Sequence, residues 1–173
     1  MLPLNLPSYP AKIQVRNGKN AIFDPLRRKF VALTPEEWVR QHFTNYLVEH
    51  KHYPASLLAN EVSLQLNGCT RRCDTVLYSR KGLRPRLIVE YKAPHVGITE
   101  ATFRQICAYN SVLQADYLIV TNGIDHRRWL AQCNPELGKL MTELCGADYQ
   151  LHAENMKKLE TYAKDASVLK KIG

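Results

Sequence analysis

Three strand-like runs follow one another closely in the middle of the chain, and this succession constrains the fold more than any other feature. The first run, Leu57 to Leu66, alternates apolar and polar residues, which is typical of a half-buried β-strand. Asn67-Gly68 supplies a turn before the second run, Cys73 to Ser79, and a glycine-containing loop precedes the third, Arg86 to Lys92. Such short connections predict an antiparallel three-stranded meander.

Helical patterns stand on both sides of this meander. Thr34-Pro35-Glu36-Glu37 has the residues of a helix start, with Thr as N-cap, Pro in the first position and Glu placed to close a capping box, so a helix is predicted from Pro35 to about His50. Apolar residues recur at helical steps from Thr99 to Leu113, and a fourth strand-like run, Asp116 to Thr121, follows. The order predicts an α/β fold with a mixed central sheet flanked by helices.

The length of 173 residues is about that of one ordinary domain. We therefore expect a single domain over residues 1–173, made of an irregular lead-in (1–33) with short strand-like fragments, a core (34–133) and C-terminal helices (134–173). Within the later part, the predicted elements are a fifth strand at Arg127 to Gln132 and helices at Pro135 to Leu144 and Ala153 to Ala163.

The charge is concentrated where the strands meet. The chain carries 24 Lys and Arg against 16 Asp and Glu, a net charge of +8, which favours polyanionic partners. Arg71 to Lys92 contains seven of the basic residues and only two acidic ones. Arg71 and Arg72 are accordingly expected to contact nucleic acid.

Composition also indicates the compartment. No window approaches the roughly 18 apolar residues of a membrane span, and the N-terminus lacks the charged and apolar regions of a signal peptide. The five Cys residues do not form the two close pairs of a zinc site, so reduced thiols are expected. These patterns predict a soluble cytoplasmic protein that does not associate with membranes.

Two acidic side chains are predicted to converge on one surface of the meander. Because strand side chains alternate faces, Glu90 and Lys92 point the same way, and pairing of the second and third runs brings Asp74 close to Glu90. Adjacent carboxylates raise each other's pKa unless a cation lies between them, and Mg²⁺ takes such oxygen ligands together with water and phosphate. The backbone carbonyl of Tyr91 could serve as one further ligand.

Such an ion would polarise a phosphodiester and lower the pKa of a bound water. Lys92, beside the ion, could orient or deprotonate that water and offset the charge of the transition state. The residues thus predict hydrolysis of phosphodiester bonds with Mg²⁺ or Mn²⁺ as cofactor.

Asp74 and, after fifteen intervening residues, Glu90-Tyr91-Lys92 resemble the D…(D/E)xK signature of the PD-(D/E)xK nuclease superfamily. More specifically, four segments are similar to the N-terminal nuclease domain of type I restriction enzyme R subunits: TPEEWVRQ, RRCDTVLY, LIVEYKAP and FRQICAYN. The likeness runs from about Phe23 to Gln132. Two features depart from the family: Cys73 replaces the usual Pro before the first Asp, and the sequence contains no helicase-like motor domain.

The resemblance implies a restriction-endonuclease-like fold, metal ligation by Asp74 and Glu90, and a role for Lys92 as the catalytic lysine. It also implies that Gln105 and Tyr109 form the QxxxY motif shared with RecB-type nucleases, which lies beside the active site and helps to position and cleave DNA. These two residues are four apart, so both can face the site from one helix.

An acidic residue on the first helix often joins the site in this superfamily. Glu37 is the expected metal ligand of this kind, with Glu36 as second choice and Glu61 left open. For Arg40 two roles stay open, an ion pair with Glu37 or a contact with a DNA phosphate.

The sequence therefore predicts a Mg²⁺-dependent DNA endonuclease domain with DNA as its partner. The alternative is a non-catalytic nucleic-acid-binding or assembly module that keeps the fold. Motor or specificity subunits acting in trans are left open, as is a homodimer, which would supply the two sites that double-strand cleavage normally needs.

Overall fold

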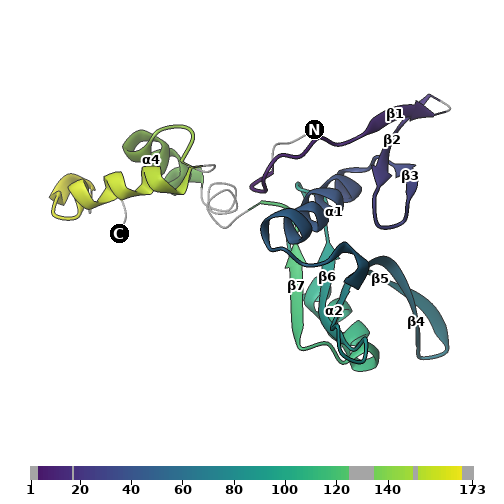
Figure 1. The fold of residues 1–173 in the computed structure, drawn as a ribbon. Helices are drawn as coiled ribbons and strands as arrows, with labels where there is room; N and C mark the ends of the chain where they lie inside the picture. Colours follow the sequence, from purple (N-terminus) through teal and green to yellow (C-terminus); the bar gives the residue numbers. More distant parts are fainter. Residues whose placement is uncertain (1–3, 17, 125–134, 150–151, 169–173) are drawn as a thin grey trace. The chain divides into compact units, whose positions relative to one another are not determined.

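The computed structural model describes residues 4–16, 18–124, 135–149 and 152–168. Contacts within the chain divide it into two compact units, Met1–Gly123 and Ile124–Gly173, and each is described by itself. The expected single domain over residues 1–173 is thus divided in two, at a point inside the expected core. The first unit contains the mixed sheet with its helices and the second contains the C-terminal helices (Figure 1).

The larger sheet confirms the predicted α/β architecture. Its strands are β4 (Leu58–Leu66), β5 (Cys69–Tyr78), β6 (Pro85–Tyr91) and β7 (Tyr117–Thr121), in the order β4-β5-β6-β7. The first three strands are antiparallel, as the short turns predicted, and β7 runs parallel to β6 after the crossover through a helix.

The second strand begins earlier than the sequence indicated. Leu66 pairs with Cys69, so only Asn67 and Gly68 form the loop between β4 and β5. Both loop residues have positive φ, 51° and 75°, as a type I′ hairpin turn requires. This tight turn extends the ladder to Thr70, Arg71 and Arg72, which the predicted second strand did not include.

Helix α1 (Pro35–Asn45) is followed directly by a π-helical turn, η1 (Tyr46–His50). Its start is capped as predicted, since the hydroxyl of Thr34 accepts a hydrogen bond from the backbone N–H of Glu37 at 3.1 Å. The capping box is only half formed, because the side chain of Glu37 bonds to Arg27, Arg40 and Gln41 instead.

Two helices provide the apolar layers on the sheet. Val39 of α1 packs with Leu77 and Val89 in one cluster, and Ile106 of α2 (Glu100–Leu113) packs with Ile88 in another. Strand residues that alternate between these clusters are buried on both faces, which explains the nearly continuous apolar run of β6. A short 3₁₀ helix, η2 (Ala55–Leu57), leads into β4.

The N-terminal segment is more regular than the predicted irregular lead-in. Three strands form a separate antiparallel sheet: β1 (Ile13–Arg16), β2 (Lys19–Asp24) and β3 (Lys29–Ala32). The fragments noted in the sequence are the outer two of these strands. The pattern missed β2 because its apolar residues are few and are buried against the body of the unit rather than alternating clearly.

The second unit contains α4 (Pro135–Cys145) and a 3₁₀ helix, η3 (Ala153–Tyr162), around Met141, Cys145 and Tyr149. The first helix confirms its prediction, and the second has 3₁₀ instead of α-helical form. The predicted strand at Arg127–Gln132 lies outside the described residues. Within the described part of the chain, no helix has both the length and the apolarity needed to cross a membrane.

Candidate active site

Asp74 of β5 and Glu90 of β6 come together on the larger sheet. Thr75 and Val89 are the last pair of the antiparallel register, and Asp74 and Glu90 lie one residue beyond it on their two strands, next to each other. Opposed residues in such a ladder point to the same face. The side chain of Asp74 is 13% exposed and that of Glu90 only 5%. Strand pairing therefore creates a sheltered pair of carboxylates.

Glu90 is held by one of its two oxygens. Lys92 Nζ donates to Glu90 Oε1 at 2.7 Å, and Gln105 Nε2 donates to the same oxygen at 2.6 Å. The other oxygen, Oε2, is buried and has no hydrogen-bond partner among the described residues. Burial, followed by the nearby charge of Asp74, raises the pKa of Glu90 to about 7. Glu90 thus has an unused buried acceptor and too little positive charge around it.

Asp74 has partners at both oxygens. Arg40 Nη2 donates to Oδ1 at 2.8 Å, and the backbone N–H of Tyr91 donates to Oδ2 at 2.8 Å. Burial still raises the pKa of Asp74, outweighing the opposing effects of the Arg40 charge and the Tyr91 hydrogen bond. The contact with the Tyr91 peptide fixes the carboxylate next to the end of β6.

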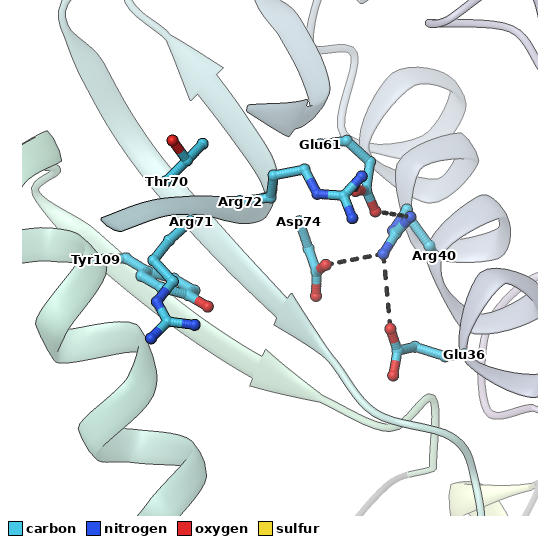
Figure 2. A pocket seen from close by; sticks show the side chains of 8 residues that line it. All are labelled: Glu36, Arg40, Glu61, Thr70, Arg71, Arg72, Asp74 and Tyr109. Carbon is cyan, nitrogen blue, oxygen red and sulfur yellow. Dashed lines mark hydrogen bonds and ion pairs between the residues drawn. The ribbon is translucent and has the colours of Figure 1, made fainter. Parts of the chain in front are cut away.

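Arg40 of α1 is the cationic centre of an acidic cluster (Figure 2). Its side chain is 4% exposed, and its guanidinium lies 2.8 Å from a Glu37 oxygen and 2.6 Å from a Glu61 oxygen, in addition to the bond with Asp74. Glu36 lies further away, at 3.7 Å. The arginine neutralises carboxylates from α1, β4 and β5, and this explains how so many acids can gather in a sheltered position.

A cavity of about 430 Å³ opens beside this cluster. Asp74 and Arg40 line it together with acids, cations and an aromatic ring from neighbouring elements (Figure 2): Glu36, Glu61, Thr70, Arg71, Arg72 and Tyr109. Arg71 and Arg72 are exposed strand residues at the mouth. One wall is therefore acidic and another basic, an arrangement suited to a phosphate group bridged to carboxylates by a cation.

Lys92 is placed to act on a group next to Glu90. Its side chain is 21% exposed, so it reaches solvent more readily than the glutamate it contacts. Burial by itself lowers the pKa of Lys92, but the hydrogen bond and charge of Glu90 outweigh it and the pKa is raised. In this state the lysine keeps its proton, which favours orienting a water or offsetting anionic charge over removing a proton.

The QxxxY pair lies against the same carboxylate. Gln105 and Tyr109 are one turn apart on α2, and the amide of Gln105 donates to Tyr109 Oη at 3.0 Å as well as to Glu90. Gln105 Oε1 also lies 3.4 Å from Lys92 Nζ. A single glutamine thus links the acid, the lysine and the tyrosine, and the tyrosine lines the cavity.

Two of the expected site residues lie differently from their predicted roles. Glu37 does not line the cavity, because its carboxylate is taken up by Arg27, Arg40 and Gln41; Glu36, the second choice, does line it. Arg40 forms the ion pair with Glu37, and its side chain is only 4% exposed; a contact of Arg40 with a DNA phosphate stays a prediction. The helical spacing could have indicated Glu36 and Arg40, four apart, as neighbours on one face.

The donor set is compatible with Mg²⁺. No group of three or more His, Cys, Asp or Glu side chains suited to a metal occurs among the described residues. Mg²⁺ needs only one or two protein carboxylates, because water and substrate phosphates complete its octahedron. The orphaned Glu90 Oε2 and the neighbouring Asp74 meet that requirement. An ion at this place would share Asp74 with Arg40 or displace the guanidinium.

Comparison with known proteins gives a family match over most of the chain and matches to curated proteins over a small part of it. The model of the family described as type I restriction enzyme R protein N terminus (HSDR_N) matches residues 35–145. That range contains the larger sheet, α1, α2 and all the residues of the site described above.

Among curated proteins, similar ones include glycogen phosphorylases, each matched over a short stretch. The enzyme of Bacillus subtilis (strain 168) is 41% identical over 52 residues, 30% of this chain. The Chlamydia pneumoniae enzyme is 38% identical over 50 residues, and the muscle form of Bos taurus 38% over 52 residues. The chain spans about 6% of the length of these relatives. No solved structure gives a significant match.

Proposed function

The chain belongs to the family of type I restriction enzyme R protein N termini, and on that basis we propose that it is a Mg²⁺- or Mn²⁺-dependent deoxyribonuclease. The observation that carries the proposal is the pairing of Asp74 with Glu90, whose buried Oε2 has no partner in the described part of the chain. This unpartnered acceptor lies next to Asp74, a second carboxylate whose pKa is raised, and a cation bound between the two would satisfy both.

In the proposed site, Asp74 and Glu90 hold the ion, and the adjacent Tyr91 carbonyl is a further candidate ligand. When bound, the ion would polarise the scissile phosphodiester and lower the pKa of the attacking water. Lys92, 2.7 Å from Glu90, orients that water and offsets the charge that develops on the phosphate. The hydrogen bonds of Gln105 to Lys92 and Glu90 hold these two side chains in position relative to each other.

The substrate strand would lie along the basic side of the cavity. Arg71 and Arg72 offer exposed guanidinium groups to phosphates, although Arg72 also lies 3.2 Å from Glu61. Tyr109, at the cavity wall, contacts the nucleotide next to the scissile bond. Motor and specificity subunits, as the family description of an R protein suggests, would bring DNA to this site in trans.

The proposal is tested by nicking of supercoiled plasmid DNA by the full chain with Mg²⁺ or Mn²⁺. Nicking is expected, with complete loss in EDTA and a fall of at least about 100-fold in Asp74→Ala and in Lys92→Ala, since each removes a group that acts on the transition state. Asp116→Ala and Lys81→Ala serve as matched controls, because both residues are exposed and lie outside the cavity. Nicking that survives EDTA or Asp74→Ala contradicts the proposal.

One observation favours a second function, a non-catalytic nucleic-acid-binding or assembly module. Arg40 and Lys92 already contact Asp74 and Glu90, so the acids have internal counter-ions without a metal. This function predicts salt-sensitive DNA binding with no metal uptake in calorimetry and no nicking by the wild-type chain. Glu90 Oε2, which has no hydrogen-bond partner among the described residues, and the raised pKa of Glu90 favour the nuclease.

The similarity to glycogen phosphorylases supports no activity of that kind here. A stretch matching 6% of such an enzyme is too small to contain an active site with its binding pockets. The cytoplasm stays the proposed location, in keeping with the four free cysteines among the described residues: Cys69, Cys73, Cys107 and Cys145.

A further inference from the structure

The N-terminal sheet β1–β3 has one face that carries cations and aromatic rings. Arg16 pairs with Lys19 and Phe23 pairs with Phe30 in the antiparallel ladders, and Lys12 lies opposite Phe23 beyond the end of β1. Opposed residues share a face, and steps of two along a strand keep to it. These five residues form what we call the cationic face.

The opposite face of the sheet is fastened to the body of the first unit. Ile22 and Asp24 on that face are both fully buried. Asp24 accepts hydrogen bonds from the backbone of Leu26 and Arg27 and, at 3.0 Å, from Asn60 of β4. The sheet is therefore fixed to the core through Ile22 and Asp24, and the cationic face is turned away from this attachment, while Ile13 and Val15 at the β1 end of the opposite face are also exposed.

Cations and rings on this face are paired with each other. The Arg16 guanidinium lies 4.8 Å from the centroid of the Phe30 ring, and Lys12 Nζ lies 5.8 Å from that of Phe23. The two rings meet edge to face at 5.2 Å. Such contacts hold the long cationic side chains in place and leave their charge available, because an aromatic ring does not neutralise it.

No acidic group competes for these cations. Residues 4–33 contain six Lys and Arg but only one acid, Asp24, which is buried on the opposite face. In the described part of the chain, none of the ion pairs involves Lys12, Arg16 or Lys19. All three are exposed, so their charge is available to a partner.

The face is also hollowed. A concave region of about 420 Å³ is lined by Arg16, Lys19 and Phe30 with the small residues Ala21 and Ala32, and also by Asn20 and Val31, which alternate onto the opposite face. Small side chains between cations and a ring leave room for a flat group to approach the sheet.

We propose that the cationic face binds single-stranded nucleic acid, with Lys12, Arg16 and Lys19 on phosphates and the Phe30–Arg16 pair as a platform for a base. Single strands expose base faces that stack on aromatic rings and guanidinium planes, whereas a duplex offers a flat protein face mainly its phosphates. The combination of rings, cations and a concave floor is what a single strand requires. The face shares no residue with the metal-site proposal and does not depend on it.

The test measures binding in EDTA, so that cleavage plays no part. Fluorescence anisotropy of the full chain with a labelled single-stranded oligonucleotide, and with the duplex of the same sequence, should show tighter binding of the single strand. Lys12→Ala/Arg16→Ala/Lys19→Ala should weaken single-strand binding by at least about tenfold and reduce the slope of log K against log salt by about 2, at roughly 0.7 per phosphate contact. Phe30→Leu, which keeps apolar bulk and removes the ring, should weaken it by about tenfold.

A charge-matched control separates this face from general attraction to a basic protein. Arg80→Ala/Lys81→Ala/Lys157→Ala removes the same charge from exposed positions elsewhere and should bind like the wild type. Duplex binding as tight as single-strand binding would overturn the proposal, as would equal losses in the control and the test variant. Because binding is measured in EDTA, where no metal-dependent cleavage takes place, a failure here is distinguishable from a failure of the proposed nuclease.

Discussion

At the scale of single residues, the site is organised by Arg40. Its guanidinium meets Glu37, Glu61 and Asp74 within 2.8 Å and is almost fully buried. A buried charge with several partners is costly to leave unpaired, so each of these acids depends on the arginine when no metal is bound. A divalent ion near Asp74 would take over part of that role.

We predict that Arg40→Gln lowers the free energy of unfolding by about 3–5 kcal/mol in EDTA, because it leaves buried carboxylates without their cation. Mn²⁺ should restore more of that loss in the variant than it adds to the wild type, since the ion then has no competitor for Asp74. Urea unfolding with and without Mn²⁺ measures both effects. Arg104→Gln, which removes only an exposed pair with Glu100, should change stability by less than about 0.5 kcal/mol. An equal Mn²⁺ effect in Arg40→Gln and wild type would argue against competition at Asp74.

At the scale of secondary-structure elements, most of the larger sheet could be predicted from the sequence. Strand alternation and two turn signals gave the meander, and the register of β5 against β6 then brought Asp74 to Glu90. The pair of Glu37 with Arg40 was one of the predicted alternatives, but its bond to Arg27 could not be predicted, because Arg27 lies in a segment whose sheet has no strong sequence pattern. The burial of Glu90 could not be predicted either, because it is set by the packing of α2 over β6 and not by the strand itself.

The link between β2 and the core predicts a pH dependence of stability. Burial raises the pKa of Asp24, but the backbone hydrogen bond of Arg27 and the side chains of Asn60 and Arg27 outweigh it, so the pKa is lowered in the folded state. A lowered folded-state pKa means that the stabilisation is present above the unfolded value of about 3.9 and is lost as pH falls through the folded value.

Asp24→Asn should therefore destabilise the chain at neutral pH and flatten the acid side of its stability profile. Thermal unfolding from neutral pH down to about pH 3 measures this, below the unfolded-state pKa of about 3.9. Asp148→Asn, an exposed acid in the second unit, is the matched control and should leave the acid side unchanged. If Asp24→Asn is less stable but keeps the pH dependence of the wild type, protonation of Asp24 does not cause the loss of stability in acid.

At the scale of the whole molecule, two compact units share one chain. The proposed metal site and the cationic face both belong to the first unit, Met1–Gly123. The family match extends beyond that unit to residue 145, into the second unit, Ile124–Gly173. The sequence did not indicate this division, because the apolar content is similar on both sides of it.

A chain that ends at Gly123 should fold and keep its metal-binding and strand-binding properties, because the core clusters of the first unit contain no residue of the second. The full chain should accordingly unfold in two transitions, of which the truncated chain keeps one. Calorimetry of both chains tests this. A truncated chain that shows no cooperative transition would mean that the units stabilise each other.

The central claim is that Asp74 and Glu90 hold a divalent cation, and anomalous diffraction from crystals soaked in Mn²⁺ tests it most directly. The account predicts a peak within coordinating distance of a carboxylate oxygen from each residue, with the formerly unpartnered Glu90 Oε2 as one ligand, and no peak in Asp74→Ala crystals. The absence of a peak in the wild type, with Arg40 still bonded to Asp74 and Lys92 to Glu90 at saturating Mn²⁺, would contradict it.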